Sequence, residues 1–217
     1  EAVAELTIGM MIAVYRKMVG GDAILRIGGD RQGVLGSELH GKTVGIVGLG
    51  AIGQRVALLA NAFGCKVLGY NRSPKALPHI TQVDKDTLLR QSDIIFAECD
   101  VISLHLPLTP ETENFIGAAE LAKMKPDAIL INTARGPIVS QEALYNALKK
   151  GQIAGAAVDV YDQEPPLPLN LELFNAPNLL MLPHMGYATR EAFETRQNIV
   201  IRNIEMWLNN TPQNQVL

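Results

Sequence analysis

Three side chains with complementary chemistry follow three short apolar runs in the second half of the chain: Arg135, Glu164 and His184. An imidazole titrates near neutral pH, so His184 could donate a proton to a developing alkoxide and take it back in the reverse direction. Glu164 could hydrogen-bond the other ring nitrogen, and Arg135 could hold a substrate carboxylate and polarise the neighbouring carbonyl. Each residue alone has an ordinary structural explanation. Together they predict the catalytic group of an enzyme that reduces a ketone beside a carboxylate.

A glycine-rich motif, Gly48-Leu49-Gly50-Ala51-Ile52-Gly53, lies between a predicted strand and a predicted helix. Gly48 permits a tight turn, Gly50 lets the backbone approach a pyrophosphate, and Gly53 lets the helix pack closely on the sheet. The pyrophosphate would bind the free N–H groups of the helix N-terminus, with Ala51 and Ile52 in its first turn. The alternative is a plain glycine turn. The strand–turn–helix context favours a dinucleotide site.

The end of the second predicted strand bears on the choice of dinucleotide. An acidic residue there would bind the ribose 2′-hydroxyl of NAD, but this chain has Asn71, Arg72 and Ser73. Asn71 and Ser73 can donate hydrogen bonds, and the guanidinium of Arg72 can bind a 2′-phosphate. The sequence therefore favours NADP, with NAD possible if Arg72 is only a solvated surface charge.

Four other residue sets have weaker signals. Asp159, at the end of a predicted strand, could accept a hydrogen bond from the nicotinamide carboxamide, or it could cap a local turn. Tyr187, three residues after His184, could line the site. Cys65 and Cys99 are expected to pack as small apolar groups. The histidines have no metal-ligand spacing with one another, so no metal is predicted.

Short, continuous, β-branched runs alternate with helical patterns, which predicts an α/β fold with a Rossmann-like, doubly wound parallel sheet. The predicted strands are residues 43–47, 66–70, 101–106, 128–132, 155–160 and 179–182. The predicted helices between and after them are residues 54–63, 85–91, 118–124, 141–150 and 189–209. Residues 92–95 and 99–102 are two possible starts of one strand, and the second is favoured.

Four segments are predicted along the chain. Residues 1–20 form a linking helix, residues 21–41 a glycine-rich connecting loop, residues 42–188 the dinucleotide-binding domain, and residues 189–217 a C-terminal helix and tail. The first helix is apolar on nearly every face, so it is either an ordinary core helix or one that docks a partner subunit or second domain. The chain starts inside this helix, as expected for an excerpt of a longer protein.

Composition excludes several classes of protein. The 217 residues are 47% hydrophobic and 19% charged, which is too apolar for a disordered chain. The formal net charge of −3, without blocks of like charge, predicts no nucleic-acid partner and no membrane association. The 2 cysteines are too few for a disulfide framework, so a cytoplasmic location is expected.

Several motifs together resemble the D-isomer-specific 2-hydroxyacid dehydrogenases. The matching segments are residues 38–50 (ELHGKTVGIVGLG), 106–112 (LPLTPET), 132–136 (NTARG) and 183–186 (PHMG). The resemblance implies that the family's catalytic arginine, glutamate and histidine are Arg135, Glu164 and His184, and that Asp159 binds the carboxamide. It also implies two cofactor-lining segments, one containing Leu106 and Pro107 and the other containing Thr133 and Ala134.

The resemblance further implies NADPH-dependent reduction of a 2-keto acid such as glyoxylate or hydroxypyruvate, in a homodimer formed through the cofactor domain. The family's N-terminal substrate domain is largely absent from this chain, so the chain alone is expected to bind dinucleotide but turn over poorly. Formate dehydrogenases of the same superfamily have glutamine at the position of Glu164 and are discounted. The alternative is a dinucleotide-sensing, corepressor-like protein. One departure concerns the substrate pocket: Tyr187 replaces the family's serine.

Overall fold

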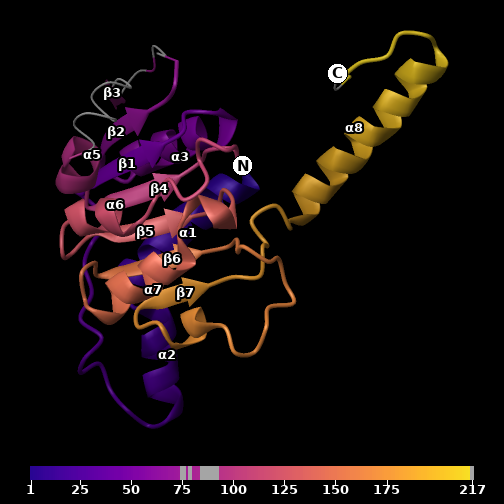
Figure 1. Cartoon of the computed structure of the whole chain (residues 1–217). Coiled ribbons are helices and arrows are strands. Elements are labelled where there is room, and N and C mark those ends of the chain that lie inside the picture. The colour runs from indigo at the N-terminus through magenta and orange to yellow at the C-terminus, as the bar shows by residue number, and fades with distance from the viewer. Residues whose placement is uncertain (74–76, 78–79, 84–92, 216–217) are drawn as a thin grey trace.

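A single parallel sheet forms the centre of the molecule in the computed structural model, which describes residues 1–73, 77, 80–83 and 93–215 (Figure 1). Its seven strands have the order β3-β2-β1-β4-β5-β6-β7, and every neighbouring pair is parallel. The strands are β1 (Thr43–Val47), β2 (Lys66–Tyr70), β3 (Thr81–Val83), β4 (Val101–Leu104), β5 (Ile129–Asn132), β6 (Gly155–Val158) and β7 (Leu179–Met181). The predicted doubly wound parallel fold is confirmed.

Helices cover both faces of the sheet, and alternate strand residues point to opposite faces. In β5, Ile129 and Ile131 pack with α1 (Ala2–Tyr15) and α3 (Ala51–Ala62). Leu130 of the same strand belongs to the opposite apolar cluster, which includes residues of α5 (Asp93–Glu98), α6 (Ala118–Lys123) and α7 (Gln141–Lys149). The continuous apolar runs of the sequence therefore reflect strands that are buried on both sides.

The N-terminal segment differs from the sequence prediction. The single helix predicted for residues 1–20 is two helices, α1 and α2 (Met18–Arg26), separated at Lys17, whose φ of 50° is left-handed. The first six residues of the predicted connecting loop, residues 21–26, are thus helical despite the glycine pair Gly20 and Gly21. An ion pair between Asp22 and Arg26, with a nitrogen–oxygen distance of 2.7 Å, spans one helical turn and supports α2.

The segment before β4 and one edge of the sheet complete the comparison with the sequence predictions. Residues 93–98 form helix α5, and the favoured strand start is correct because β4 begins at Val101. The edge strand β3 was not predicted from the sequence. The helix predicted for residues 85–91 lies outside the described residues.

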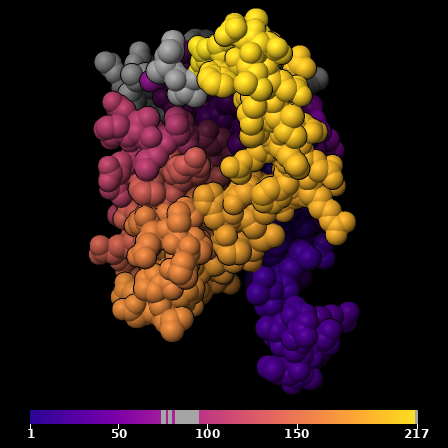
Figure 2. Space-filling model, turned by 90° about the vertical axis from the view of Figure 1, so that its right-hand side faces the viewer, coloured from indigo at the N-terminus to yellow at the C-terminus, as the bar shows by residue number. Residues whose placement is uncertain are grey.

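The C-terminal helix α8 (Arg190–Leu208) extends away from the sheet (Figure 1). Thr189 caps its N-terminus by accepting a hydrogen bond from the Ala192 N–H at 3.1 Å. None of its 19 residues is buried. In Figure 2, which looks onto the side toward which α8 projects, α8 lies in front of the body, and the indigo N-terminal segment projects at the lower end. In the described part of the chain, no helix has both the length and the apolar character that crossing a membrane requires.

Candidate active site

The three candidate catalytic residues follow three adjacent strands. Arg135 follows β5, Glu164 follows β6 and His184 follows β7, and these strands are neighbours in the sheet. Because all three strands are parallel, their carboxyl ends lie along one edge. This is the edge at which open α/β sheets bind ligands.

Glu164 and His184 form a direct pair. The distance between Nδ1 of His184 and Oε2 of Glu164 is 2.6 Å, and both side chains are partly exposed, at 34% for His184 and 47% for Glu164. The carboxylate accepts the hydrogen bond from Nδ1–H and so fixes the neutral tautomer with Nε2 unprotonated, or stabilises the imidazolium. Nε2, on the other side of the ring, is left for proton exchange with a substrate.

A buried aspartate holds the turn that carries His184. Asp159 is 2% exposed, and its two carboxylate oxygens accept hydrogen bonds from the N–H groups of Met185 (2.9 Å) and Gly186 (2.8 Å). His184 has a left-handed φ of 56°, which is unfavourable for a residue with a Cβ. The two hydrogen bonds offset this cost and fix the direction of the imidazole. Of the two roles considered for Asp159, turn capping is therefore present in the structure.

A buried asparagine, whose role was not predicted from the sequence, holds the backbone that carries Arg135, as Asp159 does for His184. Asn132, 1% exposed at the end of β5, donates to the Arg135 carbonyl oxygen at 2.9 Å and accepts from the Ala134 N–H at 3.1 Å. The Arg135 side chain is exposed, and its guanidinium donates to the Ala134 carbonyl oxygen at 2.7 Å. The only sequence signal was an amide at the end of a buried strand, which is costly unless it is hydrogen-bonded.

The loop after β5 also contacts its neighbours on both sides. A Cβ on Gly136 would overlap the backbone of Tyr161, so only glycine allows this loop to approach the segment leading to Glu164. On the other side, the Thr133 hydroxyl lies 3.2 Å from the hydroxyl of Thr7 in α1. The loops carrying Arg135 and Glu164 are therefore packed together.

The glycine motif has the shape that a dinucleotide requires. Gly48 has φ 103°, and a Cβ there would lie 2.5 Å from the carbonyl oxygen of His105. A Cβ on Gly53 would overlap the carbonyl oxygen of Gly48. Gly50, by contrast, is exposed and faces open space, and as the N-cap of α3 it supplies no side-chain cap to the first-turn N–H groups. Those N–H groups, including those of the exposed Ala51 and Ile52, can bind a pyrophosphate.

The three residues after β2 have two different environments: Asn71 is hydrogen-bonded to the backbone around it, whereas Arg72 and Ser73 are exposed. The Asn71 carboxamide accepts from the Leu49 N–H at 3.1 Å and donates to the Ser73 carbonyl oxygen at 2.8 Å. Asn71 thus holds the glycine loop, a role not predicted for it. Arg72 and Ser73, which follow Asn71, are exposed, so their side chains are accessible to a ligand.

The segment after β4 is a compact turn next to the glycine loop. Thr112 donates its hydroxyl to the Pro107 carbonyl oxygen at 2.7 Å and accepts from the Thr109 N–H at 2.8 Å, which holds Leu106 and Pro107 in place. His105 lies 2.9 Å from the Ser103 hydroxyl through Nε2, and burial lowers the pKa of His105 to about 4. His105 is therefore neutral at physiological pH.

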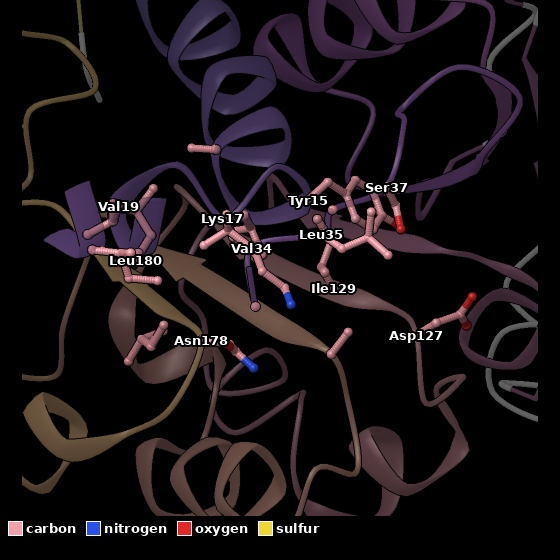
Figure 3. A pocket seen from close by; sticks show the side chains of 18 residues that line it. Tyr15, Lys17, Val19, Val34, Leu35, Ser37, Asp127, Ile129, Asn178 and Leu180 are labelled. Atoms are coloured by element: carbon pink, nitrogen blue, oxygen red, sulfur yellow. The ribbon is translucent and has the colours of Figure 1, made fainter. Parts of the chain in front are cut away.

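A cavity of about 410 Å³ lies at the opposite edge of the sheet (Figure 3). Its walls come from the α1–α2 junction, residues 33–37 and the starts of β5 and β7, with Leu35, Ile129 and Leu180 among the lining residues. It is therefore separate from the strand ends that carry Arg135, Glu164 and His184. Within the described residues, no three histidine, cysteine, aspartate or glutamate side chains gather in a way that could hold a metal ion.

Residues 8–186 match the profile of a known family, described as D-isomer specific 2-hydroxyacid dehydrogenase, NAD binding domain. This match covers most of the chain and includes the glycine motif and the three strand ends. The chain belongs to this family. The family resemblance inferred from the motifs is thereby confirmed.

Individual relatives agree with the family assignment. The chain is 44% identical over 216 residues to a glyoxylate reductase of Thermococcus litoralis, with 94% of this chain and 62% of that relative covered. A solved acyclic imino acid reductase (Bsp5), in complex with NADPH and D-Arg, is 37% identical with a TM-score of 0.87 over 100% of this chain and 67% of that one. A D-lactate dehydrogenase from Lactobacillus jensenii with NAD+ is 32% identical, also with a TM-score of 0.87, over 100% and 68% of the two chains.

The chain spans about three fifths of the length of this glyoxylate reductase, 62%. It contains the dinucleotide-binding sheet and the loops that carry Arg135, Glu164 and His184. Of the two solved structures named above, one is a complex with NADPH and the other a complex with NAD+.

Proposed function

We propose that this chain is the cofactor-binding part of an NADP(H)-dependent enzyme that interconverts a 2-keto acid and a D-2-hydroxy acid. The observation that carries the proposal is the 2.6 Å hydrogen bond between His184 and Glu164, on strand ends next to the loop of Arg135. Glyoxylate and hydroxypyruvate are the first substrates to test, because the first curated relative is a glyoxylate reductase.

In this proposal the bound nicotinamide supplies hydride to the keto carbon or accepts it from the hydroxy acid. His184 donates a proton from Nε2 to the carbonyl oxygen during reduction and recovers it during oxidation. Glu164 stabilises the imidazolium through Nδ1 and keeps the ring in one orientation. Arg135 pairs with the substrate carboxylate, because a guanidinium can donate two parallel hydrogen bonds to it.

The remaining predicted residues would hold the dinucleotide. Gly48, Gly50 and Gly53 shape the pyrophosphate loop, whose α3 N–H groups would bind the phosphates. Leu106 and Pro107, with Thr133 and Ala134, would line the nicotinamide half of the site. Asp159 is also proposed to accept from the carboxamide, because each carboxylate oxygen has a second lone pair beyond its backbone hydrogen bond.

The preference for NADP is proposed to rest on Arg72, with Asn71 and Ser73 beside it. Arg72→Asp should weaken NADPH binding about tenfold or more, the scale of a lost charge-assisted hydrogen bond, and should leave NADH binding nearly unchanged or improved. Arg31→Asp, another exposed arginine, is the matched control for the change of charge. Equal effects of Arg72→Asp on both dinucleotides would contradict the role of Arg72.

Turnover distinguishes the enzyme from a dinucleotide-sensing, corepressor-like protein of the same fold. The full-length gene product is assayed for NADPH oxidation with 2-keto acids and for NADPH binding by fluorescence. His184→Asn should lower kcat at least a hundredfold, and Glu164→Gln should lower it less, because a neutral amide still orients the ring. His40→Asn, an exposed histidine elsewhere, is the control. Tight NADPH binding without turnover on any 2-keto acid would favour the sensor.

A second copy of the chain is the proposed macromolecular partner. Two exposed apolar side chains line the cavity of Figure 3, Val19 at 60% and Leu35 at 88%, and Ile27, at the C-terminal end of α2, is 85% exposed. Light scattering after size exclusion tests the homodimer, and a monomer at micromolar concentration would contradict it. A cytoplasmic location is proposed from the two free cysteines, Cys65 and Cys99, and cell fractionation tests it.

A further inference from the structure

A buried tyrosine connects two of the loops that carry the candidate catalytic residues. Tyr161 follows β6, three residues before Glu164, and is 3% exposed. Its hydroxyl donates a hydrogen bond to the carbonyl oxygen of Leu182 at 2.8 Å, and Leu182 follows β7, two residues before His184. The two strands are neighbours in the sheet (Figure 1). A side chain of the Glu164 loop therefore holds the backbone that leads to His184.

This hydrogen bond lies at the point where the ladder between β6 and β7 ends. The Leu182 N–H donates to the Val158 carbonyl oxygen at 2.9 Å, but the next residue, Pro183, has no N–H with which to continue the ladder. Beyond His184, the backbone is held by the buried carboxylate of Asp159. The turn is therefore held by the phenol before His184 and by the carboxylate after it.

Tyr161 is also packed against the loop of Arg135. Its ring belongs to the buried apolar cluster that includes Ala134 and Ile138, which lie on either side of Arg135 in the chain. Its backbone lies so close to Gly136 that a Cβ on that glycine would overlap it. The close packing of a buried ring leaves its hydroxyl one position. Tyr161 thus connects the loops of all three candidate catalytic residues.

The hydroxyl of Tyr161 remains a hydrogen-bond donor at neutral pH. Burial raises the pKa of Tyr161 to about 12, and the negative charge of Asp159 acts in the same direction. The aromatic ring on the other side of His184 restrains it less. The ring centroid of Tyr187 lies 5.9 Å from that of His184, but Tyr187 is 49% exposed and lies on the same turn.

We propose that Tyr161 is a positioning residue for proton transfer, which sets the place of the His184 imidazole relative to Glu164 and Arg135. The inference rests on the proposed function and adds a residue that acts through His184. Nε2 of His184 must meet the keto oxygen while Nδ1 stays 2.6 Å from Glu164. Because these residues stand on different loops, the loops must keep one relative position. A misplacement of about 1 Å can lower a rate on the order of a hundredfold.

The test removes the hydroxyl and keeps the ring. In the full-length gene product, assayed with NADPH and its preferred 2-keto acid, Tyr161→Phe should lower kcat at least tenfold. KM for the keto acid and Kd for NADPH should change less than threefold, because Arg135 and the glycine motif are retained. In a His184→Asn background, Tyr161→Phe should lower the residual kcat less than twofold, because no imidazole is left to position.

Tyr15→Phe is the matched control. Tyr15 is 7% exposed and donates its hydroxyl to the Asp100 carbonyl oxygen, also at 2.8 Å, but at the opposite edge of the sheet. Each substitution removes one buried hydrogen bond to a backbone carbonyl group, so both should lower Tm by similar amounts. Only Tyr161→Phe should lower kcat.

Three results would overturn the inference. Wild-type kcat in Tyr161→Phe, or equal losses of kcat in the two phenylalanine variants, would make the Tyr161 hydroxyl a structural group and leave the proposed function intact. A full loss on Tyr161→Phe in the His184→Asn background would show that Tyr161 does not act through His184. Absence of turnover by the wild type with every 2-keto acid would overturn the proposed function as well.

Discussion

Replacing Asp159 with asparagine should destabilise the fold, although it changes only one oxygen to an amide nitrogen. The carboxylate is 2% exposed and accepts two backbone hydrogen bonds, from Met185 and Gly186. Hydrogen bonds to charged groups contribute about 1.5–3 kcal/mol each. Asparagine can accept only one of the two and places its own NH2 against the other N–H donor.

The expected loss in the free energy of unfolding is therefore about 2–4 kcal/mol, because one hydrogen bond is lost and one buried donor is left without an acceptor. For a chain of this size, each kcal/mol lowers Tm by about 2–4 °C, so a fall of roughly 5–15 °C is expected. Urea unfolding followed by circular dichroism measures the free energy, and the m-value checks that the transition remains two-state.

Asp127→Asn is the matched control, because Asp127 is exposed and its substitution should change stability by less than about 0.5 kcal/mol. If Asp159→Asn unfolds within 0.5 kcal/mol of the wild type, the two hydrogen bonds do not hold the turn, and the reasoning fails. A loss of NADPH affinity without a loss of stability would instead assign Asp159 to the carboxamide alone.

Two further predictions follow from the glycine loop and from the opposite edge of the sheet. Gly53→Ala should lower Tm in thermal melting, although alanine has the better helix propensity, because its Cβ would overlap the Gly48 carbonyl oxygen. Gly50→Ala should have the Tm of the wild type, because a Cβ there meets open space. The same variant should bind NADPH at least tenfold more weakly in fluorescence titration, because its Cβ would keep the backbone away from the pyrophosphate. Burial raises the pKa of Asp100, but hydrogen bonds from Lys125 and from a backbone N–H outweigh it and hold this pKa below its usual value. A carboxyl group whose pKa is lowered in the folded state stabilises the fold above its unfolded pKa of about 4, and this contribution is lost as the pH falls through the folded pKa. Lys125→Met removes one of the hydrogen bonds that lower the pKa of Asp100. The free energy of unfolding of this variant should therefore fall less steeply than that of the wild type between about pH 5 and pH 2.

The sheet could be predicted from the sequence because its central strands are buried on both faces. Continuous apolar runs such as residues 128–131 leave few alternatives to a parallel strand covered by helices. The three-residue edge strand Thr81–Val83 has no such pattern and was missed. Helix α2 was missed because its glycine pair suggested a loop, while the ion pair that supports the helix connects Asp22 and Arg26, residues with no distinctive pattern in the sequence.

The candidate site could be predicted in part. The glycine motif and the strand ends with Arg135, Glu164 and His184 were visible because chemistry and spacing coincide there. The residues that hold them were harder to find. Asn132 is the last residue of buried strand β5 and Asp159 directly follows buried strand β6, and a polar side chain at such a place could bind a ligand or close a turn. Only the distances to particular backbone groups separate the two roles.

These buried polar residues also explain how exposed loops can present side chains in fixed directions. Arg135 and Glu164 are exposed and His184 is half-buried, so packing alone would leave them mobile. Asn132 fixes the backbone on which Arg135 sits, and Asp159 fixes the backbone beside His184, each through two hydrogen bonds made at the end of a buried strand. The rigid sheet thereby determines the positions of groups that must still reach solvent and substrate. A substitution at either buried residue should consequently impair the site more than its distance from the reacting atoms suggests.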